Sequence, residues 1–170
     1  RSLTRREGSN PSFSVIFLKK INFKTILLFL LFLLIYALPA FFFKVDKEFY
    51  ASLKKINIPV IVFPIVWSII YIFLSILLVF LVRNYPFKEH KKLYIYYLIN
   101  YLIQASFTPV FFMGHNLFLG YIIAIATFAS TIFLFLEVFP LNKKASLLLV
   151  PYLGWGLFAS ILSILIYIWN

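Results

Sequence analysis

The residues of this chain that could take part in chemistry are tryptophans, tyrosines and two amides, all set within long apolar runs. Trp67 and Tyr71 lie in a run from Pro59 to Val82 that contains no charged residue. Residues three or four positions apart share one face of a helix. The predicted inward face of this helix consists of Pro64, Trp67, Ser68, Tyr71 and Ser75. The predicted lipid-facing side consists of Ile65, Ile69, Ile72, Ile76 and Val79.

A second polar and aromatic face lies in the run from Leu93 to Met113. Its positions are Tyr97, Asn100, Gln104 and either Thr108 or Phe107. An amide in hydrocarbon needs a hydrogen-bond partner, so this face is expected to look inward. Asn100 and Gln104 could join helices, at roughly 0.6–2 kcal/mol per contact, or they could bind a ligand. The sequence leaves both roles open.

The last apolar run carries a third face of this kind. Its positions are Pro151, Trp155, Ala159 and Ser163, at four-residue steps. Indole and phenol rings stack on the faces of flat ligands, and amides form hydrogen bonds at a ligand's rim. The three faces together therefore predict an interior that suits a flat, apolar ligand with a few polar edges.

Several kinds of chemistry have no support in this sequence. No predicted span carries Asp, Glu, Lys, Arg or His away from its ends, and such groups usually serve proton relays, ion-coupled transport and acid–base catalysis. There is no cysteine, and the two histidines, His90 and His115, fall in separate predicted loops. We therefore expect no metal site and no required cofactor, and we do not expect hydrolysis or phosphoryl transfer.

The composition indicates a membrane protein. Hydrophobic residues make up 64% of the chain and charged residues 12%, against about half and a quarter in soluble domains. Such a chain needs a lipid bilayer as its solvent. The net charge of +11 comes from basic residues placed between the apolar runs, where they meet anionic headgroups. A nucleic-acid partner is not expected.

The apolar runs predict an all-α membrane protein, a five-transmembrane-helix bundle. Residues 1–22 are expected to form a disordered or non-native basic tail, and residues 23–170 a single transmembrane domain. The approximate spans are 25–43, 58–82, 93–113, 117–136 and 145–169. Cytoplasmic loops of membrane proteins are enriched in Lys and Arg. Of the 16 basic residues only Lys44, Lys47, Lys54 and Lys55 lie opposite the N-terminus, so the N-terminus is predicted to be cytoplasmic.

The first predicted loop has two interpretations. Phe49 and Tyr50 are followed by lysines, which is typical of an anchor at headgroup depth. The same segment, with Phe49, Tyr50 and Pro59, could instead be a lid over the mouth of a cavity. The anchor is the simpler interpretation of the sequence alone.

Longer stretches of the chain resemble one known family. Residues 49–55 and 63–71 are similar to the first loop and second helix of the TspO/MBR proteins, the tryptophan-rich sensory or translocator proteins. Residues 151–163 resemble the fifth-helix signature of that family, and Asn170 matches an Asn that often closes it. Asn100, Gln104 and the segment 108–117 resemble the third helix and the turn after it. The resemblance covers nearly all of residues 25–170.

The resemblance implies a five-helix transmembrane bundle, often a homodimer, with a cavity beneath the first loop. Members of the family bind porphyrins, haem-related tetrapyrroles, sterols or benzodiazepine-type ligands, and some bacterial members promote the breakdown of protoporphyrin IX. By position, Trp67 and Trp155 look like the pair of cavity tryptophans implicated in that reaction. Asn100 and Gln104 look like the amides of the third helix near the ligand. The helical faces described above add Tyr71, Tyr97, Phe107, Ala159 and Ser163 as further candidate ligand-binding residues.

This sequence departs from the family's pattern at several positions. The loop segment 55–59 is about two residues shorter and lacks the usual Trp and paired prolines. Phe107 replaces a Trp, Ile123 an Asp that is often present, and Ser75 a Gly. Ile164 stands where the sterol-recognition segment has Tyr, and no Arg or Lys follows it. The sequence therefore gives no reason to expect cholesterol.

These observations lead to three hypotheses of function. The first is an integral membrane protein that binds a porphyrin or haem-type tetrapyrrole and acts as a sensor or transporter. The second is an enzyme that degrades porphyrin with light and oxygen, with Trp67 and Trp155 as candidate catalytic residues. The third is a structural membrane subunit without a ligand, in which the aromatic faces serve only packing.

Overall fold

A computed structural model describes residues 22–170 as a helical chain, with no strand in that range. The long helices are α2 (Phe23–Phe42), α4 (Val62–Asn84), α5 (Lys91–Thr108), α6 (Leu117–Val138) and α8 (Val150–Trp169). The short ones are α3 (Lys47–Ser52), the π-helix η1 (Pro109–Met113), α7 (Lys143–Ser146) and the 3-10 helix η2 (Leu147–Leu149). The expected tail over 1–22 lies outside the described residues, apart from Asn22.

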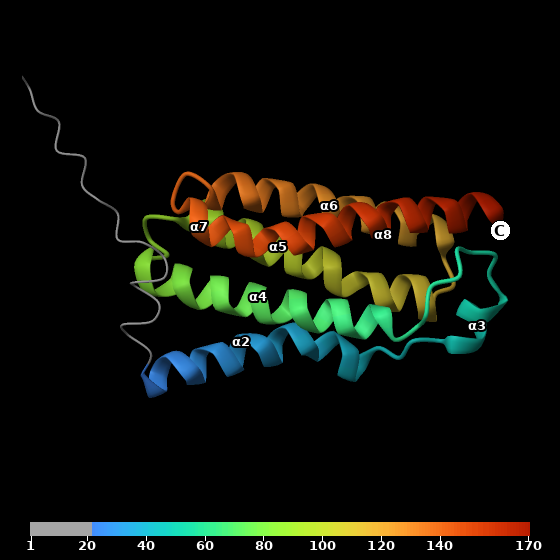
Figure 1. Ribbon diagram of the computed structural model, residues 1–170, viewed down its shortest axis with the longest axis horizontal. Helices are drawn as coiled ribbons and strands as arrows, with labels where there is room; N and C mark the ends of the chain where they lie inside the picture. Colours follow the sequence, from blue (N-terminus) through green and yellow to red (C-terminus); the bar gives the residue numbers. More distant parts are fainter. Residues whose placement is uncertain (1–21) are drawn as a thin grey trace, which may run out of the picture.

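The long helices lie side by side with their axes roughly parallel or antiparallel (Figure 1). Helix α2 packs mainly against α4, and α6 packs most extensively against α8 and α5. The short helix α3 lies at the same end of the bundle as the C-terminus, and α7 lies at the opposite end (Figure 1). The loop between α2 and α4 therefore covers one end of the interior.

Asn and Asp side chains set where several helices begin. Asn22, Asp46, Asn116 and Asn142 each accept a hydrogen bond from the backbone N–H three residues later, at 2.9–3.0 Å. This bond satisfies one of the N–H groups that the first turn of a helix leaves without a partner. Short polar residues between the apolar runs thus start α2, α3, α6 and α7.

A π-helix continues α5 toward the following turn. Pro109 has no N–H, so it cannot donate the usual hydrogen bond back along α5. The chain widens there into η1, which ends where Gly114 N donates to Pro109 O at 2.9 Å. Such widened turns often occur at functional sites. Here the widened turn carries Phe111 and Phe112 beneath α3.

Four helical segments of the described chain are long and apolar enough to cross a membrane: Phe23–Phe42, Val62–Asn84, Leu117–Val138 and Lys143–Trp169. The third expected span, 93–113, is not among them. Its α-helical part, Lys91–Thr108, is only 18 residues long and combines two lysines with several tyrosines and both amides. The last expected span is longer than predicted, because α7 and η2 run directly into α8.

The inward face of α4 is rotated from the predicted one. Pro64 and Ser68, which were expected inside, are exposed, while Val79, which was expected to face lipid, is fully buried. The buried residues of α4 are Ile70, Leu74, Ser75, Leu77, Val79, Phe80 and Leu81. The rotation has a physical cause: the second half of α4 is enclosed by neighbouring elements, including α7 and η2, so apolar side chains there are buried on more than one side.

The outer surface of the described helices is strongly apolar. Exposed side chains include Leu27 and Leu34 on α2, Ile65 on α4, and Leu136 on α6, each more than half exposed. Soluble monomers rarely expose continuous apolar surface on this scale. Hydrocarbon is the medium in which such a surface is stable.

Candidate functional site

Both predicted tryptophans are half-buried and lie on different helices, Trp67 on α4 and Trp155 on α8. The ring of Trp67 lies 5.5 Å from Tyr71 and 6.0 Å from Tyr152, measured between centroids. The ring of Trp155 lies 5.6 Å from Phe63 in an edge-to-face arrangement. Each indole therefore belongs to an aromatic cluster in the bundle interior.

One aromatic cluster connects Trp155 to α3. Phe63 contacts both Trp155 and Tyr50, with ring centroids 5.6 Å and 6.0 Å away. Tyr50 in turn lies 6.0 Å from Phe112 of η1. The first loop thus packs an aromatic residue of α3 against the Trp155 cluster.

A second cluster lies deeper, around Trp67. Tyr71 stacks on Tyr36 at 5.7 Å, and Tyr36 meets Tyr101 edge-on at 5.6 Å. Tyr101 donates a hydrogen bond to the backbone oxygen of Ile35 at 2.9 Å, which ties α5 to α2. These rings bring together α2, α4 and α5 beside Trp67.

Three buried polar atoms have no hydrogen-bond partner within residues 22–170: Tyr50 OH, Tyr97 OH and Trp155 Nε1. Buried polar groups are nearly always paired, so each exception calls for an explanation. Leaving such a group unpaired costs about 1–3 kcal/mol. Tyr50 and Trp155 both contact Phe63, so two of the three belong to the aromatic cluster beneath α3.

Asn100 is buried and serves as a junction of three helices. Its side-chain nitrogen donates to Ser130 Oγ at 2.9 Å and to Thr131 Oγ1 at 3.0 Å, both on α6. Its side-chain oxygen accepts from Tyr152 OH of α8 at 3.3 Å. The protein itself therefore satisfies both ends of this amide. Of its two predicted roles, the contacts match the joining of helices.

Gln104 is also buried, and it is bonded differently. Its side-chain nitrogen donates to Tyr71 OH at 2.8 Å, connecting α5 to α4. Tyr71 stacks against Tyr36 and lies beside Trp67. This amide therefore reaches the aromatic cluster around Trp67.

The remaining predicted lining residues lie at several depths. Tyr97 and Ser163 are buried, whereas Phe107 and Ala159 are half-buried. Phe107 stacks on Phe111 of η1 with ring centroids 5.1 Å apart, so it belongs to the cluster beneath α3. Whether any of them touches a ligand stays a prediction.

The predicted lid residues are placed unequally. Phe49 and Tyr50 of α3 are half-buried and pack onto η1 and Phe63. Pro59 is exposed, and its carbonyl accepts from Val62 N at 2.9 Å at the start of α4. Pro59 therefore ends the loop instead of covering the interior.

Two further contacts fasten the first loop. Asn170 forms two hydrogen bonds with the backbone of Lys54. The Lys54 N–H donates to Asn170 Oδ1 at 2.9 Å, and Asn170 Nδ2 donates to the Lys54 carbonyl oxygen at 3.0 Å. The ammonium of Lys55 donates to the carbonyls of Tyr50 and Leu53 at the end of α3, and it lies 4.6 Å from the centre of the Tyr50 ring. A lysine at a helix C-terminus is favourable.

Sequence reasoning missed several residues at this end of the bundle. Phe63 was not predicted as a site residue, yet it joins Tyr50 to Trp155. Asp46 and His115, 69 positions apart, form an ion pair across the loop. The Asp46 N-cap could have been found from the acidic residue before a short helical pattern. The pairing with His115 had no sequence signal.

Other features of the described residues lie outside this region. No group of three or more His, Cys, Asp or Glu side chains that could hold a metal ion occurs among residues 22–170. A shallow apolar groove of about 280 Å³ lies between α5 and α6, lined by Tyr96, Ile99, Ile103, Ala126, Ala129, Ser130 and Phe133. None of the predicted ligand-binding residues lines it.

The apolar outer surface, the spanning helices and the aromatic interior define a multi-pass helical membrane protein. Comparison with known proteins then identifies its kind. The sequence profile of the TspO/MBR family matches residues 26–169. That is nearly the whole chain, so the chain belongs to the TspO/MBR family, as the resemblance implied.

Individual relatives agree with this assignment. The chain is similar to the tryptophan-rich protein TspO of Bacillus cereus, with 28% identity over 153 residues, covering 89% of this chain and 97% of the relative. It is 30% identical over 137 residues to the uncharacterized membrane protein YtaB of Bacillus subtilis, covering 78% of this chain and 88% of that relative. The tryptophan-rich protein TspO of Archaeoglobus fulgidus is 29% identical over 126 residues, covering 73% of this chain and 81% of that relative.

Proposed function

We propose that this protein binds a flat tetrapyrrole, of the porphyrin or haem type, in the aromatic interior beneath α3, and that it acts as a sensor or transporter. The bundle would cross the membrane five times, with α5 and η1 together forming the third crossing and the N-terminus in the cytoplasm. The ligand would stack on the rings around Trp67 and Trp155, and access would require α3 to move.

The observation that carries the proposal is the unpaired indole N–H of Trp155. It is buried against aromatic rings, and no described protein atom accepts its hydrogen bond. A macrocycle with acceptor groups at its rim would supply both a stacking surface and that missing acceptor. Stacking on an aromatic ring adds about 0.5–1.5 kcal/mol beyond the burial of area.

A third crossing by α5 is supported by the hydrogen bonds of its polar side chains. Asn100 is paired with α6 and α8, Gln104 with α4, and Tyr101 with α2. Polar groups can lie at membrane depth when they pair within the bundle. The low apolarity of α5 is therefore compatible with a crossing helix whose polar side chains pair inside the bundle and whose outer side carries the exposed Ile95, Leu98, Ile99 and Leu102.

The test is uptake of protoporphyrin IX or haem by the purified protein in detergent, followed through the Soret-type absorption band. We expect saturable binding that Trp67→Ala and Trp155→Ala each weaken by tenfold or more. The matched control is Trp169→Ala, since Trp169 is the remaining tryptophan and lies exposed at the end of α8. It should bind like the wild type.

Two results would contradict the proposal. One is that neither protoporphyrin IX nor haem binds, or that neither changes the melting temperature of the protein, which would favour a structural subunit. The other is that the folded Trp67→Ala and Trp155→Ala proteins bind porphyrin as tightly as the wild type. In that case the ligand would lie elsewhere, for instance at the outer groove between α5 and α6.

A further inference from the structure

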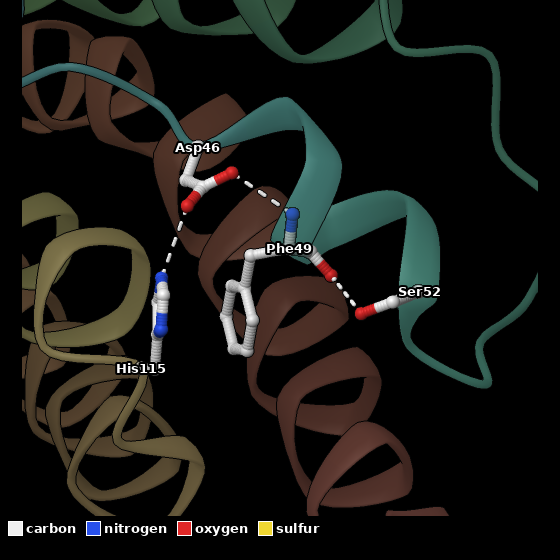
Figure 2. Close-up of polar contacts among 4 residues, drawn as sticks. All are labelled: Asp46, Phe49, Ser52 and His115. Atoms are coloured by element: carbon white, nitrogen blue, oxygen red, sulfur yellow. Dashed lines mark hydrogen bonds and ion pairs between the residues drawn. The ribbon is translucent and has the colours of Figure 1, made fainter.

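An ion pair joins the first loop to the turn between η1 and α6. Asp46 Oδ2 lies 3.1 Å from His115 Nε2, while the other oxygen, Oδ1, accepts the hydrogen bond from Phe49 N at 2.9 Å. Figure 2 shows the carboxylate between these two partners, at the start of α3. One carboxylate therefore both starts α3 and holds it to the end of the bundle.

Phe49 adds a second contact to the same histidine. Its ring stacks on His115 with centroids 4.0 Å apart and an interplanar angle of 16°. Phe49 also meets Phe111 of η1 at 6.0 Å. A charged imidazolium is attracted to the face of an aromatic ring, and this attraction weakens when the imidazole loses its charge. Both contacts of α3 with His115 therefore depend on the same proton.

The backbone fixes the histidine in place. His115 has a φ of 48°, which is in the left-handed region that non-glycine residues seldom adopt. The residues on either side are fastened: Gly114 N donates to Pro109 O at 2.9 Å, and Asn116 N to Val110 O at 3.2 Å. Uncommon conformations of this kind persist where the surroundings impose them. The turn therefore presents the ring toward α3 in a fixed position.

We propose that Asp46 and His115 form a proton-dependent latch that holds α3 closed while the histidine is charged and releases it more readily once the histidine is neutral. The latch controls access to the interior, so its use in ligand binding rests on the function proposed above. The ion pair itself and its effect on α3 do not depend on that function. Asp46 and His115 are 38% and 50% exposed at their side chains, so protons of the surrounding solution reach both.

The direction of the pH dependence follows from the charges. The hydrogen bond from Phe49 N lowers the pKa of the Asp46 carboxyl most, and the contact with His115 lowers it further, so the charged form of this carboxylate is favoured. Histidine side chains change charge between about pH 5 and 8. The latch is therefore expected to be stronger at the acidic end of this range than at the basic end.

Few other charges face this contact. The other charged side chains of the first loop are Lys44, Lys47, Glu48, Lys54 and Lys55. Lysine and glutamate side chains in general keep their charge between about pH 5.5 and 8. The facing elements, which are η1, the first turns of α6 and the last turns of α8, carry no charged side chain. Histidine is the side-chain type whose charge ordinarily changes across the physiological range, and His115 is the histidine at this end of the bundle.

The test is hydrogen exchange of the α3 backbone, read as protection factors so that the intrinsic effect of pH cancels. Exposed ion pairs change an equilibrium by up to about fivefold, and the stacked Phe49 adds to this. We expect the protection of the Tyr50 amide in the ligand-free protein to fall about two- to tenfold between pH 5.5 and 8. Amides of α7, at the other end of the bundle, should show no such change.

Variants separate the latch from general loosening. Asp46→Asn keeps an N-cap of equal quality but removes the charge, and His115→Asn suits a left-handed backbone but does not titrate. Both should give pH-independent protection of α3, at or below the wild-type level of pH 8. His90→Asn, which removes the other histidine, should retain the wild-type pH dependence. The proposal is overturned if wild-type protection does not change with pH, or if it changes equally in Asp46→Asn.

A second measurement keeps this result apart from the proposed function. In protein that binds protoporphyrin IX, the Asp46→Asn variant should take up the pigment at pH 5.5 two- to tenfold faster than the wild type. If α3 shows the expected pH dependence but no porphyrin binds at any pH, the latch stands and the tetrapyrrole function fails. If porphyrin binds and α3 protection is constant, the latch fails and the function stands.

Discussion

Gln104 donates its side-chain amide to the hydroxyl of Tyr71 at 2.8 Å, which connects α5 to the aromatic cluster around Trp67. Replacing Gln104 with Leu removes this bond but leaves the tyrosine ring in place. We expect the melting temperature of the ligand-free protein to fall less than it does for Asn100→Leu, because only the one hydrogen bond to the half-buried Tyr71 hydroxyl is lost. Porphyrin affinity should fall by about 1–2 kcal/mol, or roughly tenfold, because a donor beside the ligand is lost.

The control for this prediction is Tyr71→Phe. It removes the same hydrogen bond from the other side and leaves the Gln104 amide free for a ligand. If Gln104 serves the ligand directly, the Tyr71→Phe variant should bind porphyrin at least as tightly as the Gln104→Leu variant does. Equal melting shifts in ligand-free and ligand-saturated Gln104→Leu protein, with affinity intact, would show that Gln104 only joins helices.

Asn100 should behave differently, because its hydrogen bonds are all to protein. Asn100→Leu leaves Ser130, Thr131 and Tyr152 without their shared partner in the interior. We expect a loss of about 1–3 kcal/mol of stability, visible as a lower melting temperature with and without ligand. Porphyrin affinity of the folded fraction should fall less than it does for Gln104→Leu. The reverse order of the two affinities would contradict this assignment of roles.

The sequence predicted the helical class and the family, and the small-residue face of α6 is a pattern of the same local kind. Gly120, Ala124, Thr127 and Thr131 fall at helical spacing, and all are buried where α6 packs against its neighbours. Small residues at such spacing allow close helix approach in membranes. Patterns of this kind are local, so they can be read without knowing the partners.

The orientation of α4 and the pairing of the first loop could not be predicted from local patterns. Val79 was predicted to face lipid because Ile and Val occur both at lipid-facing positions and in protein interiors. Burial on several sides depends on neighbours far away in the chain, which a local pattern does not contain. The contact between Asp46 and His115 likewise depends on where two loops meet. Asn100 could be placed on the inward face, but its partners on α6 and α8 determine which of its roles it serves.

Two glycines allow a matched test of packing. A Cβ added at Gly120 would lie 2.5 Å from Phe111 Cδ2 and 3.2 Å from Phe111 Cβ, so the whole Phe111 side chain would have to move. We expect Gly120→Ala to cost about 1–3 kcal/mol, as is usual for overpacking. The displaced Phe111 should also loosen its contact with Phe49, which would lower the protection of α3 in hydrogen exchange.

Gly154→Ala is the control for Gly120→Ala. Nothing lies within 4 Å of a Cβ added at Gly154, which is exposed in the first half of α8. Alanine favours a helix over glycine by about 0.5–1 kcal/mol, so this variant should melt at the same or a higher temperature. Equal destabilisation by the two substitutions would mean that the contact with Phe111 is not the cause.

The distribution of basic residues predicts the membrane orientation. Lys24, Arg83, Lys88, Lys91, Lys92, Lys143 and Lys144 belong to the end with α7, and Lys44, Lys47, Lys54 and Lys55 to the end with α3 (Figure 1). The end with more Lys and Arg should be cytoplasmic. Because the chain has no cysteine, single cysteines at positions 54, 88 and 143 can report on it. An impermeant thiol reagent should label position 54 in intact cells and not the other two; the opposite pattern would reverse the orientation.

Binding and degradation of a porphyrin can be separated at Trp67 and Trp155. Indole is the most oxidisable side chain in an interior that has no cysteine, and Phe keeps a ring that can stack. Trp67→Phe and Trp155→Phe should therefore each lower porphyrin affinity less than about tenfold.

If the protein is an enzyme, the same variants should nearly abolish light-driven loss of protoporphyrin IX in air, while Trp169→Phe should not. If the protein only binds, the wild type and all three variants should lose the pigment at the rate of free protoporphyrin in detergent. Pigment recovered from the complex in the dark should then show an undiminished Soret-type band. Pigment loss that is fast in the wild type and equally fast in Trp67→Phe and Trp155→Phe would exclude both indoles as the reacting groups.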